Sequence, residues 1–217
     1  GARRIVVEGV VQGVGFRPFV YRTAIKHGLK GEVSNRTDGV TVFVLGDSRA
    51  VGEFSNDILT TAPEASDIKS IEVFPKMIPE YDSFRIAGST NVDDRITEVS
   101  PDIAVCPECL REMDSFPRRK DYPLINCTCC GPRFSITEAL PYDRPLTSMK
   151  SFMMCPGCRR EYEDVSDRRF HAQPVACNLC GPEYFYRDSN KEISGIGSVL
   201  METAVQINAG KTLAVKG

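Results

Sequence analysis

The sequence lacks several features that would assign it to a class at once. No apolar run approaches the roughly 18 residues that a membrane-spanning helix needs. Neither sign of charge dominates, because 27 Lys and Arg face 29 Asp and Glu, and this balance argues against a protein that mainly coats nucleic acid or an anionic membrane. The opening residues do not have the pattern of a secretory signal, although a processed signal would leave no trace.

Cysteine is absent from the first 105 residues, and all nine cysteines lie between Cys106 and Cys180. The rest of the composition, with 41% apolar and 26% charged residues, is that of an ordinary globular chain and excludes a disordered or fibrous protein. The break in cysteine content therefore predicts a change of domain. The predicted parts are a first domain over 1–90, a polar linker over 91–105, a cysteine module over 106–182 and a further segment over 183–217.

The first domain has the pattern of a β-α-β-β-α-β unit. Apolar, β-rich runs predict strands at 5–11, 31–36, 40–45, 68–74 and 84–87. Helical spacing of apolar residues begins at Phe16 and again after Ser48, which can cap the second helix. The pair Asp38-Gly39 predicts a hairpin turn between the second and third strands. The predicted fold class is α+β, with a split βαβ sheet that carries two helices on one face.

A glycine turn, residues 12–17, joins the first strand to the first helix. Gly13 and Gly15 let the backbone turn tightly, so that successive N–H groups can point into one concavity at a helix N-terminus. Arg17 follows in the first helical turn and can add a bidentate charged clamp. This arrangement suits an anion such as phosphate. The alternative is that two glycines merely connect a strand to a helix.

The residues around this turn resemble the signature of the acylphosphatase family. The resemblance extends over most of residues 3–90 in three blocks, Val11–Arg17, His27–Gly31 and Val33–Gly39. It implies a ferredoxin-like sandwich, a phosphate held by Arg17 and the loop amides, and an attacking water held by Asn35. The catalytic residues implied are thus Arg17 and Asn35. The implied phosphate-binding residues are Gln12, Gly13, Val14, Gly15, Phe16 and Arg17.

The cysteine module contains four Cys-x-x-Cys pairs in two repeats. In each repeat, two pairs are separated by a loop that allows them to meet around one tetrahedral metal ion. Two glutamates and two pairs of arginines recur in step with the cysteines, at Glu112 and Glu161 and at 118–119 and 168–169. The predicted ligands are Cys106, Cys109, Cys127 and Cys130 in the first repeat and Cys155, Cys158, Cys177 and Cys180 in the second.

Zinc fits this pattern better than the alternatives. Disulfides are disfavoured because the number of cysteines is odd and the Cys-x-x-Cys spacing strains a structural disulfide. A redox site is disfavoured because four such motifs share one small module. Four thiolates leave no open position, so both zinc sites are predicted to be structural. Cys129 is left over and is predicted to be a non-ligand, and His171 is predicted to be a packed or hydrogen-bonded histidine.

The arginine clusters of the module could indicate a nucleic-acid-binding zinc ribbon. However, residues 106–182 contain 11 Lys and Arg against 10 Asp and Glu, so that the module is almost neutral. A nonspecific binder of nucleic acid needs an excess of positive charge. We therefore expect these arginines to pair with acidic residues of the module or to pack on neighbours.

The combination of the two parts resembles the HypF family of carbamoyltransferases, which mature nickel–iron hydrogenases. The resemblance covers essentially the whole chain and is carried by three blocks, Ile125–Ile136, Tyr142–Met149 and Asp167–Pro174. Cys129 stands where the family often has histidine. The resemblance implies an enzyme that uses carbamoyl phosphate and ATP to carbamoylate the C-terminal cysteine of a partner maturation protein. The fragment in hand would supply the cleavage of carbamoyl phosphate.

Residues 183–217 resemble the start of the adenylate-forming, YrdC-like domain of that family, with a helix and a strand between Ile193 and Gly217. The chain is therefore expected to be an N-terminal fragment, and ATP and Mg²⁺ are expected only in the downstream domains. The expected location is cytoplasmic, and neither nucleic acid nor a membrane is an expected partner. Two alternatives stay open at this point. They are a stand-alone acylphosphatase with a zinc docking module and a zinc-ribbon regulator that binds nucleic acid.

Overall fold

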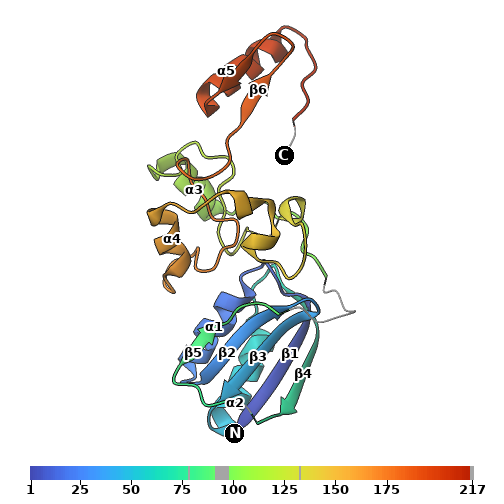
Figure 1. Ribbon diagram of the computed structural model, residues 1–217, viewed down its shortest axis with the longest axis vertical. Helices are drawn as coiled ribbons and strands as arrows, with labels where there is room; N and C mark the ends of the chain where they lie inside the picture. The colour runs from blue at the N-terminus through green and yellow to red at the C-terminus, as the bar shows by residue number, and fades with distance from the viewer. Residues whose placement is uncertain (78, 91–97, 132, 216–217) are drawn as a thin grey trace.

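The structure is a computed structural model of the chain, and it describes residues 1–77, 79–90, 98–131 and 133–215. Three parts follow one another along the longest axis, with a sheet domain at the N-terminal end, the cysteine module in the middle and a short C-terminal unit beyond it (Figure 1). The linker predicted over 91–105 lies in part outside the described residues. Its described part, 98–105, contains neither helix nor strand.

The sheet domain is built on one five-stranded sheet with the order β4-β1-β3-β2-β5. All neighbouring strands are antiparallel except β2 and β5, which run parallel. Asn35 of β2 lies opposite Val40 of β3, directly beside the predicted hairpin turn. The strands are β1 (Ala2–Val10), β2 (Lys30–Arg36), β3 (Gly39–Leu45), β4 (Asp67–Pro75) and β5 (Phe84–Ile86).

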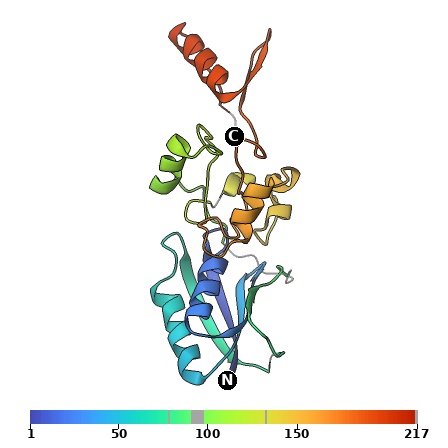
Figure 2. The same ribbon diagram turned by 90° about the vertical axis from the view of Figure 1, so that its left-hand side faces the viewer.

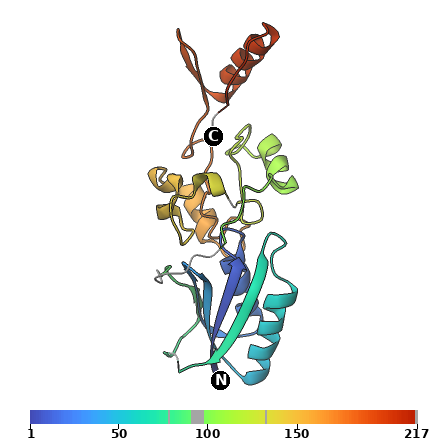
Figure 3. The same ribbon diagram turned by 90° about the vertical axis from the view of Figure 1, so that its right-hand side faces the viewer.

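Two helices, α1 (Phe16–Lys26) and α2 (Ser48–Thr60), cover one face of this sheet (Figures 2 and 3). Their apolar faces and the strands enclose one core that contains no cysteine. This arrangement confirms the predicted α+β ferredoxin-like fold class. The cap of α2 differs from the prediction, because the carboxylate of Asp47, one residue before Ser48, accepts the N–H groups of Arg49 and Ala50.

The cysteine module has little regular structure. Its two α-helices, α3 (Pro107–Ser115) and α4 (Pro156–Glu163), each start directly after the first cysteine of a repeat, with proline at the first helical position. Three short 3₁₀ helices lie between them, η1 (Phe134–Ile136), η2 (Arg144–Leu146) and η3 (Ser148–Ser151). The two small cores of the module are formed in large part by the cysteines themselves.

The C-terminal unit consists of a hairpin, β6 (Phe185–Arg187) and β7 (Glu192–Ser194), and a helix, α5 (Ile196–Asn208). The helix lies within the segment where one is predicted. Residues 211–215 form no strand, and 216–217 lie outside the described residues. Within the described ranges, no helix is both long and apolar enough to cross a membrane.

Candidate active site and metal centres

The glycine turn lies at the end of the sheet domain that meets the cysteine module (Figure 1). Gly13 and Gly15 both have left-handed backbone conformations, with φ of 76° and 75°. Gly15 is the N-cap of α1. A Cβ atom on Gly13 would lie 3.1 Å from the ring of Tyr142, and one on Gly15 would lie 3.0 Å from the Cβ atom of Thr128. Both positions therefore favour glycine for backbone conformation and for space.

The backbone of the turn offers a set of unused donors. In the part of the chain that the structure describes, no hydrogen bond connects the N–H groups of residues 13–17 to another protein group. Successive free N–H groups at a helix N-terminus form a concave site for an anion. This is the geometry that the sequence predicts for residues 12–17.

The structure brings Arg17 and Asn35 together at one pocket beside the turn. Both side chains are buried, with 8% and 1% of each residue exposed, and both line the pocket. The side-chain Nδ2 of Asn35 donates to the carbonyl of Tyr142 over 3.3 Å, whereas its Oδ1 has no partner among the described residues. A buried acceptor without a partner is costly, and it points to a group that the site is built to bind.

Gln12 has a different position from the rest of the turn. Its side-chain Nε2 donates to the carbonyls of Arg36 and Gly39 at the hairpin between β2 and β3. Its Oε1 accepts the N–H of Tyr142 over 2.8 Å. The Gln12 side chain thus connects the turn, the hairpin and the cysteine module, and only its backbone remains a candidate for phosphate binding.

The far wall of the pocket comes from the cysteine module. The pocket is about 330 Å³ when its open mouth is included. Asp143 contacts Arg17 directly, with 2.6 Å between Oδ1 and Nη2. These wall residues belong to the sequence blocks that resemble the HypF family, but nothing in the sequence indicates that the blocks face the turn. The module residues that line the pocket are Cys127, Thr128, Gly131, His171, Ala172, Gln173 and Pro174.

His171 is held in this wall by aromatic contacts. Its ring lies 4.9 Å from that of Tyr162 and 4.6 Å from that of Phe170, between ring centroids. Burial, and to a lesser extent the positive charge of Arg17, lower the pKa of His171 to about 4. The imidazole is therefore neutral at pH 7, and it lies outside both groups of cysteines.

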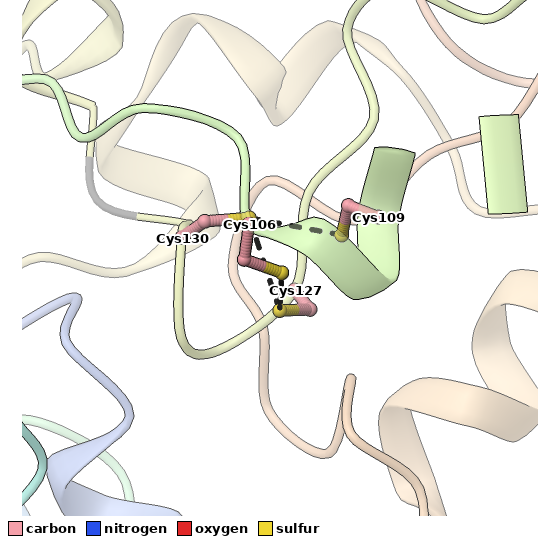
Figure 4. Close-up of side chains that lie close together, drawn as sticks. All are labelled: Cys106, Cys109, Cys127 and Cys130. Carbon is pink, nitrogen blue, oxygen red and sulfur yellow. Dashed lines mark hydrogen bonds between the residues drawn. The ribbon is translucent and has the colours of Figure 1, made fainter. Parts of the chain in front are cut away.

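Four predicted ligands converge at the start of α3. Cys106 and Cys109 come from the helix end, and Cys127 and Cys130 come from the loop that follows, with the four side chains pointing to one another (Figure 4). Three sulfur–sulfur distances are 3.7–3.8 Å. A tetrahedral ion with metal–sulfur bonds of about 2.3 Å requires about 3.8 Å between sulfurs. The thiols therefore fit a metal of zinc's size.

The second repeat forms an equivalent group at the start of α4. Cys155, Cys158, Cys177 and Cys180 have sulfur–sulfur distances of 3.7–3.9 Å, and in each group all sulfurs lie within 4.8 Å of one another. Cys129 is exposed and belongs to neither group. All nine cysteines are free thiols. The module therefore has two Cys₄ groups that can each hold a metal ion.

The arginine pairs connect the two repeats to each other. Arg119 of the first repeat is fully buried and pairs with Glu161 of the second. Arg169 of the second repeat pairs with Glu112 of the first. The sequence predicts pairing with acids of the module, and the structure shows that the partner belongs to the opposite repeat in both cases. We call this arrangement the arginine exchange.

Arginines of each repeat also contact cysteine sulfurs of the other repeat. Arg119 lies 3.5 Å from the sulfur of Cys158, and Arg168 lies 2.5 Å from the sulfur of Cys109. Donors from each repeat therefore face the negative charge that the thiolates of the other repeat would carry. Because these guanidinium groups are engaged within the module, they do not form a free basic surface.

Comparison with protein families assigns both parts of the chain. Residues 3–86 match the model of the acylphosphatase family, and residues 105–137 and 154–186 each match the HypF finger. The matched segments include the glycine turn with Arg17 and Asn35, and both groups of cysteines.

Individual relatives agree with this division. The carbamoyltransferase HypF of Rhodobacter capsulatus is 45% identical over 219 residues, which cover 100% of this chain and 29% of that protein. The acylphosphatase of Solibacter usitatus is 43% identical over 86 residues, 39% of this chain and 88% of that protein. The crystal structure of full-length HypF in the phosphate- and nucleotide-bound form has a TM-score of 0.89 and 46% identity, with 100% of this chain and 28% of that one covered. The chain thus spans less than a third of the length of these HypF relatives.

Proposed function

The chain belongs to the HypF family, whose N-terminal part it matches, and to the acylphosphatase family over residues 3–86, and we propose from this that it cleaves carbamoyl phosphate at the glycine turn. The observation that carries the proposal is the meeting of Arg17, the buried acceptor of Asn35 and the unused N–H groups of residues 13–17 at one pocket. A solved HypF with phosphate and nucleotide bound supports a phosphate ligand in the family.

In the proposed reaction, the phosphate group of carbamoyl phosphate lies against the N–H groups of the turn. Arg17 neutralises charge on its equatorial oxygens, and Asn35 Oδ1 accepts a hydrogen bond from the attacking water and directs the water to phosphorus. A bond forms between the water oxygen and phosphorus while the bond from phosphorus to the acyl oxygen breaks. The products are inorganic phosphate and carbamate, and one water proton is released. Such a reaction depends on positioning and charge stabilisation more than on a strong base.

We propose that each Cys₄ group holds a structural Zn²⁺. Support comes from the sulfur–sulfur distances, the match to the HypF finger and the arginine donors beside Cys109 and Cys158. Four thiolates leave no open position on the metal, so its part is to hold the fold of the module. Such a site contributes on the order of 10 kcal/mol to local folding. We also propose that the first domain ends at residue 90 and that the zinc-binding module extends from residue 106 to residue 182.

The further steps belong to the proposed function of the whole protein. We propose that the carbamoyl group is activated with ATP and Mg²⁺ in domains downstream of this chain and is then transferred to the C-terminal cysteine of a partner maturation protein. The family assignment supports this proposal. In these steps, the present chain supplies the cleaved carbamoyl group, and residues 183–217 lead into the next domain.

Phosphate release from carbamoyl phosphate tests the proposal. Arg17→Ala should lower the rate by about 10²–10³-fold or more, because a positioned charge on the transferring group is lost. Arg17→Lys should also fail, since a point charge cannot replace the guanidinium fork. Asn35→Ala should reduce the rate similarly and weaken the binding of inorganic phosphate less than Arg17→Ala does.

The control is Arg49→Ala, which removes an exposed arginine of α2 whose partner is Glu53. It should hydrolyse carbamoyl phosphate at the unaltered rate. Wild-type hydrolysis by Arg17→Ala would show that cleavage happens elsewhere. A strong preference for aryl acyl phosphates over carbamoyl phosphate would favour a general acylphosphatase instead, and a mobility shift with nucleic acid would favour the regulator.

A further inference from the structure

The guanidinium of Arg17 already has an anionic partner within the protein. Oδ1 of Asp143 lies 2.6 Å from Nη2 of Arg17, and the two side chains are 20% and 9% exposed. The residues are 126 positions apart and belong to different parts of the molecule. The group that is proposed to bind the phosphate of the substrate is thus in a short ion pair with a carboxylate of the cysteine module.

The surrounding contacts keep this carboxylate beside the site. Ser89 donates its hydroxyl proton to the other oxygen, Oδ2 of Asp143. On one side of Asp143, the backbone N–H of Tyr142 donates a hydrogen bond to Gln12, and its carbonyl accepts one from Asn35.

On the other side, Arg144 donates to the carbonyls of Phe152, Gln173 and Val175. The two anchored neighbours therefore hold the backbone of Asp143 beside the pocket, so that its carboxylate stays within reach of Arg17.

The carboxylate changes the charge that a phosphate meets. Arg17 alone presents one positive charge, whereas Arg17 with Asp143 presents none. The Solibacter usitatus acylphosphatase is covered over 88% of its length by 86 aligned residues, which is the extent of the sheet domain, so the cysteine module has no counterpart there. A phosphate dianion at Arg17 would lie within a few ångströms of the Asp143 carboxylate and would be repelled by it.

We propose that Asp143 is a built-in competitor of phosphate for Arg17. This inference rests on the proposed function of the glycine turn. The substrate displaces the carboxylate from Nη2 when it binds, and the carboxylate returns to Nη2 after cleavage and favours departure of the inorganic phosphate. Asp143 is thus a positioning residue that sets the affinity of the site for phosphate. It keeps the site from being filled by the phosphate that the reaction releases.

Binding of inorganic phosphate to the zinc-loaded protein, measured by calorimetry, tests this proposal without relying on turnover. Asp143→Asn keeps the shape of the side chain and removes its charge, and it should tighten phosphate binding by about tenfold or more. Inhibition of carbamoyl phosphate hydrolysis by phosphate should strengthen by the same factor. Ser89→Ala keeps the Asp143 carboxylate but removes the hydroxyl that donates to it. This variant should shift both measurements in the same direction as Asp143→Asn, but by a smaller factor.

The matched control is Glu138→Gln, which removes one negative charge from the same module. Glu138 is exposed and pairs with Lys150, and phosphate binding should stay within twofold of the wild type. Unchanged or weaker phosphate binding by Asp143→Asn, with zinc content intact, would overturn the proposal. Arg17→Ala separates the two levels of inference. If it leaves phosphate binding unchanged, the glycine turn is not the site and the proposed function fails as well.

Discussion

At the scale of single residues, the pocket contains one buried polar group without a hydrogen-bond partner in the described part of the chain and one that already has an ionic partner. Asn35 has a buried oxygen that lacks a partner among the described residues, whereas Arg17 is already paired with Asp143. His171 adds a neutral imidazole to the same wall. None of these side chains could serve as a strong base at pH 7, which agrees with a reaction that depends on positioning.

The protonation of His171 gives a prediction for pH. Its pKa is lowered from 6.5 to about 4 in the folded protein, so the unfolded state binds more protons between these values. Stability from this residue is therefore present above pH 6.5 and is lost as the pH falls towards 4. The loss between pH 7 and pH 5 should be about 2 kcal/mol.

Nuclear magnetic resonance can measure this protonation directly. The chain has only two histidines, so that a His27→Gln variant leaves one imidazole signal, which should titrate near pH 4. His171→Asn is the matched variant for the stability measurement, since asparagine tolerates the left-handed backbone at this position (φ 56°). A signal that titrates above pH 6 would contradict the buried, neutral imidazole.

At the scale of elements, the arginine exchange makes the two repeats one unit. We expect two zinc ions per chain. Arg168→Met should weaken zinc at the first site by about tenfold or more, because it removes the donor 2.5 Å from Cys109. Zinc transfer from the protein with both sites loaded to a chelating dye measures this, and one of the two zinc ions should be released faster than in the wild type.

The matched control is Arg118→Met, which removes the equivalent arginine of the first repeat. Arg118 contacts Glu161 of the second repeat, so its loss should leave the first site unaffected. Cys129→Ser should also leave the zinc content unchanged. Zinc release by Arg168→Met at the same rate as by Arg118→Met would show that the contact with Cys109 adds nothing to zinc binding.

The elements differ in how far the sequence predicts them. The strands and helices of the first domain follow from local patterns, such as the apolar run of β1 and the Asp38-Gly39 turn before β3. The bounds of the other four strands agree within one residue, whereas β1 starts three residues earlier than predicted. The thiol groups follow from spacing. The arginine exchange does not, because residues that recur in step, such as Glu112 and Glu161, give no sign of which arginine each one meets. The contact between Arg17 and Asp143 leaves no periodic signal at all.

At the scale of the whole molecule, the pocket is shared between two parts that are stabilised differently. The sheet domain has a core of aliphatic and aromatic side chains without cysteine. The cores of the module depend on thiols, and thus on metal if zinc is bound. One wall of the site is therefore independent of metal and the other is not.

Chelation should separate the two parts. Removal of metal should unfold the cysteine module and leave the sheet domain folded, because the two proposed zinc sites lie in the module alone. Circular dichroism and limited proteolysis should show a resistant product that ends near residue 90. Protein with zinc restored is the control. Loss of the sheet domain together with the module would show that the core of the first domain is not sufficient on its own.

The arginine exchange has a consequence for a chain that is still being made. Translation proceeds from the N-terminus, so the four thiols of the first group leave the ribosome before Arg168 and Arg169 do. The first site of a nascent chain therefore has all its metal ligands but not the guanidinium groups that face them. We expect the metal captured earliest to be exchangeable until the second repeat has emerged, so that maturation of the module is completed from its C-terminal end.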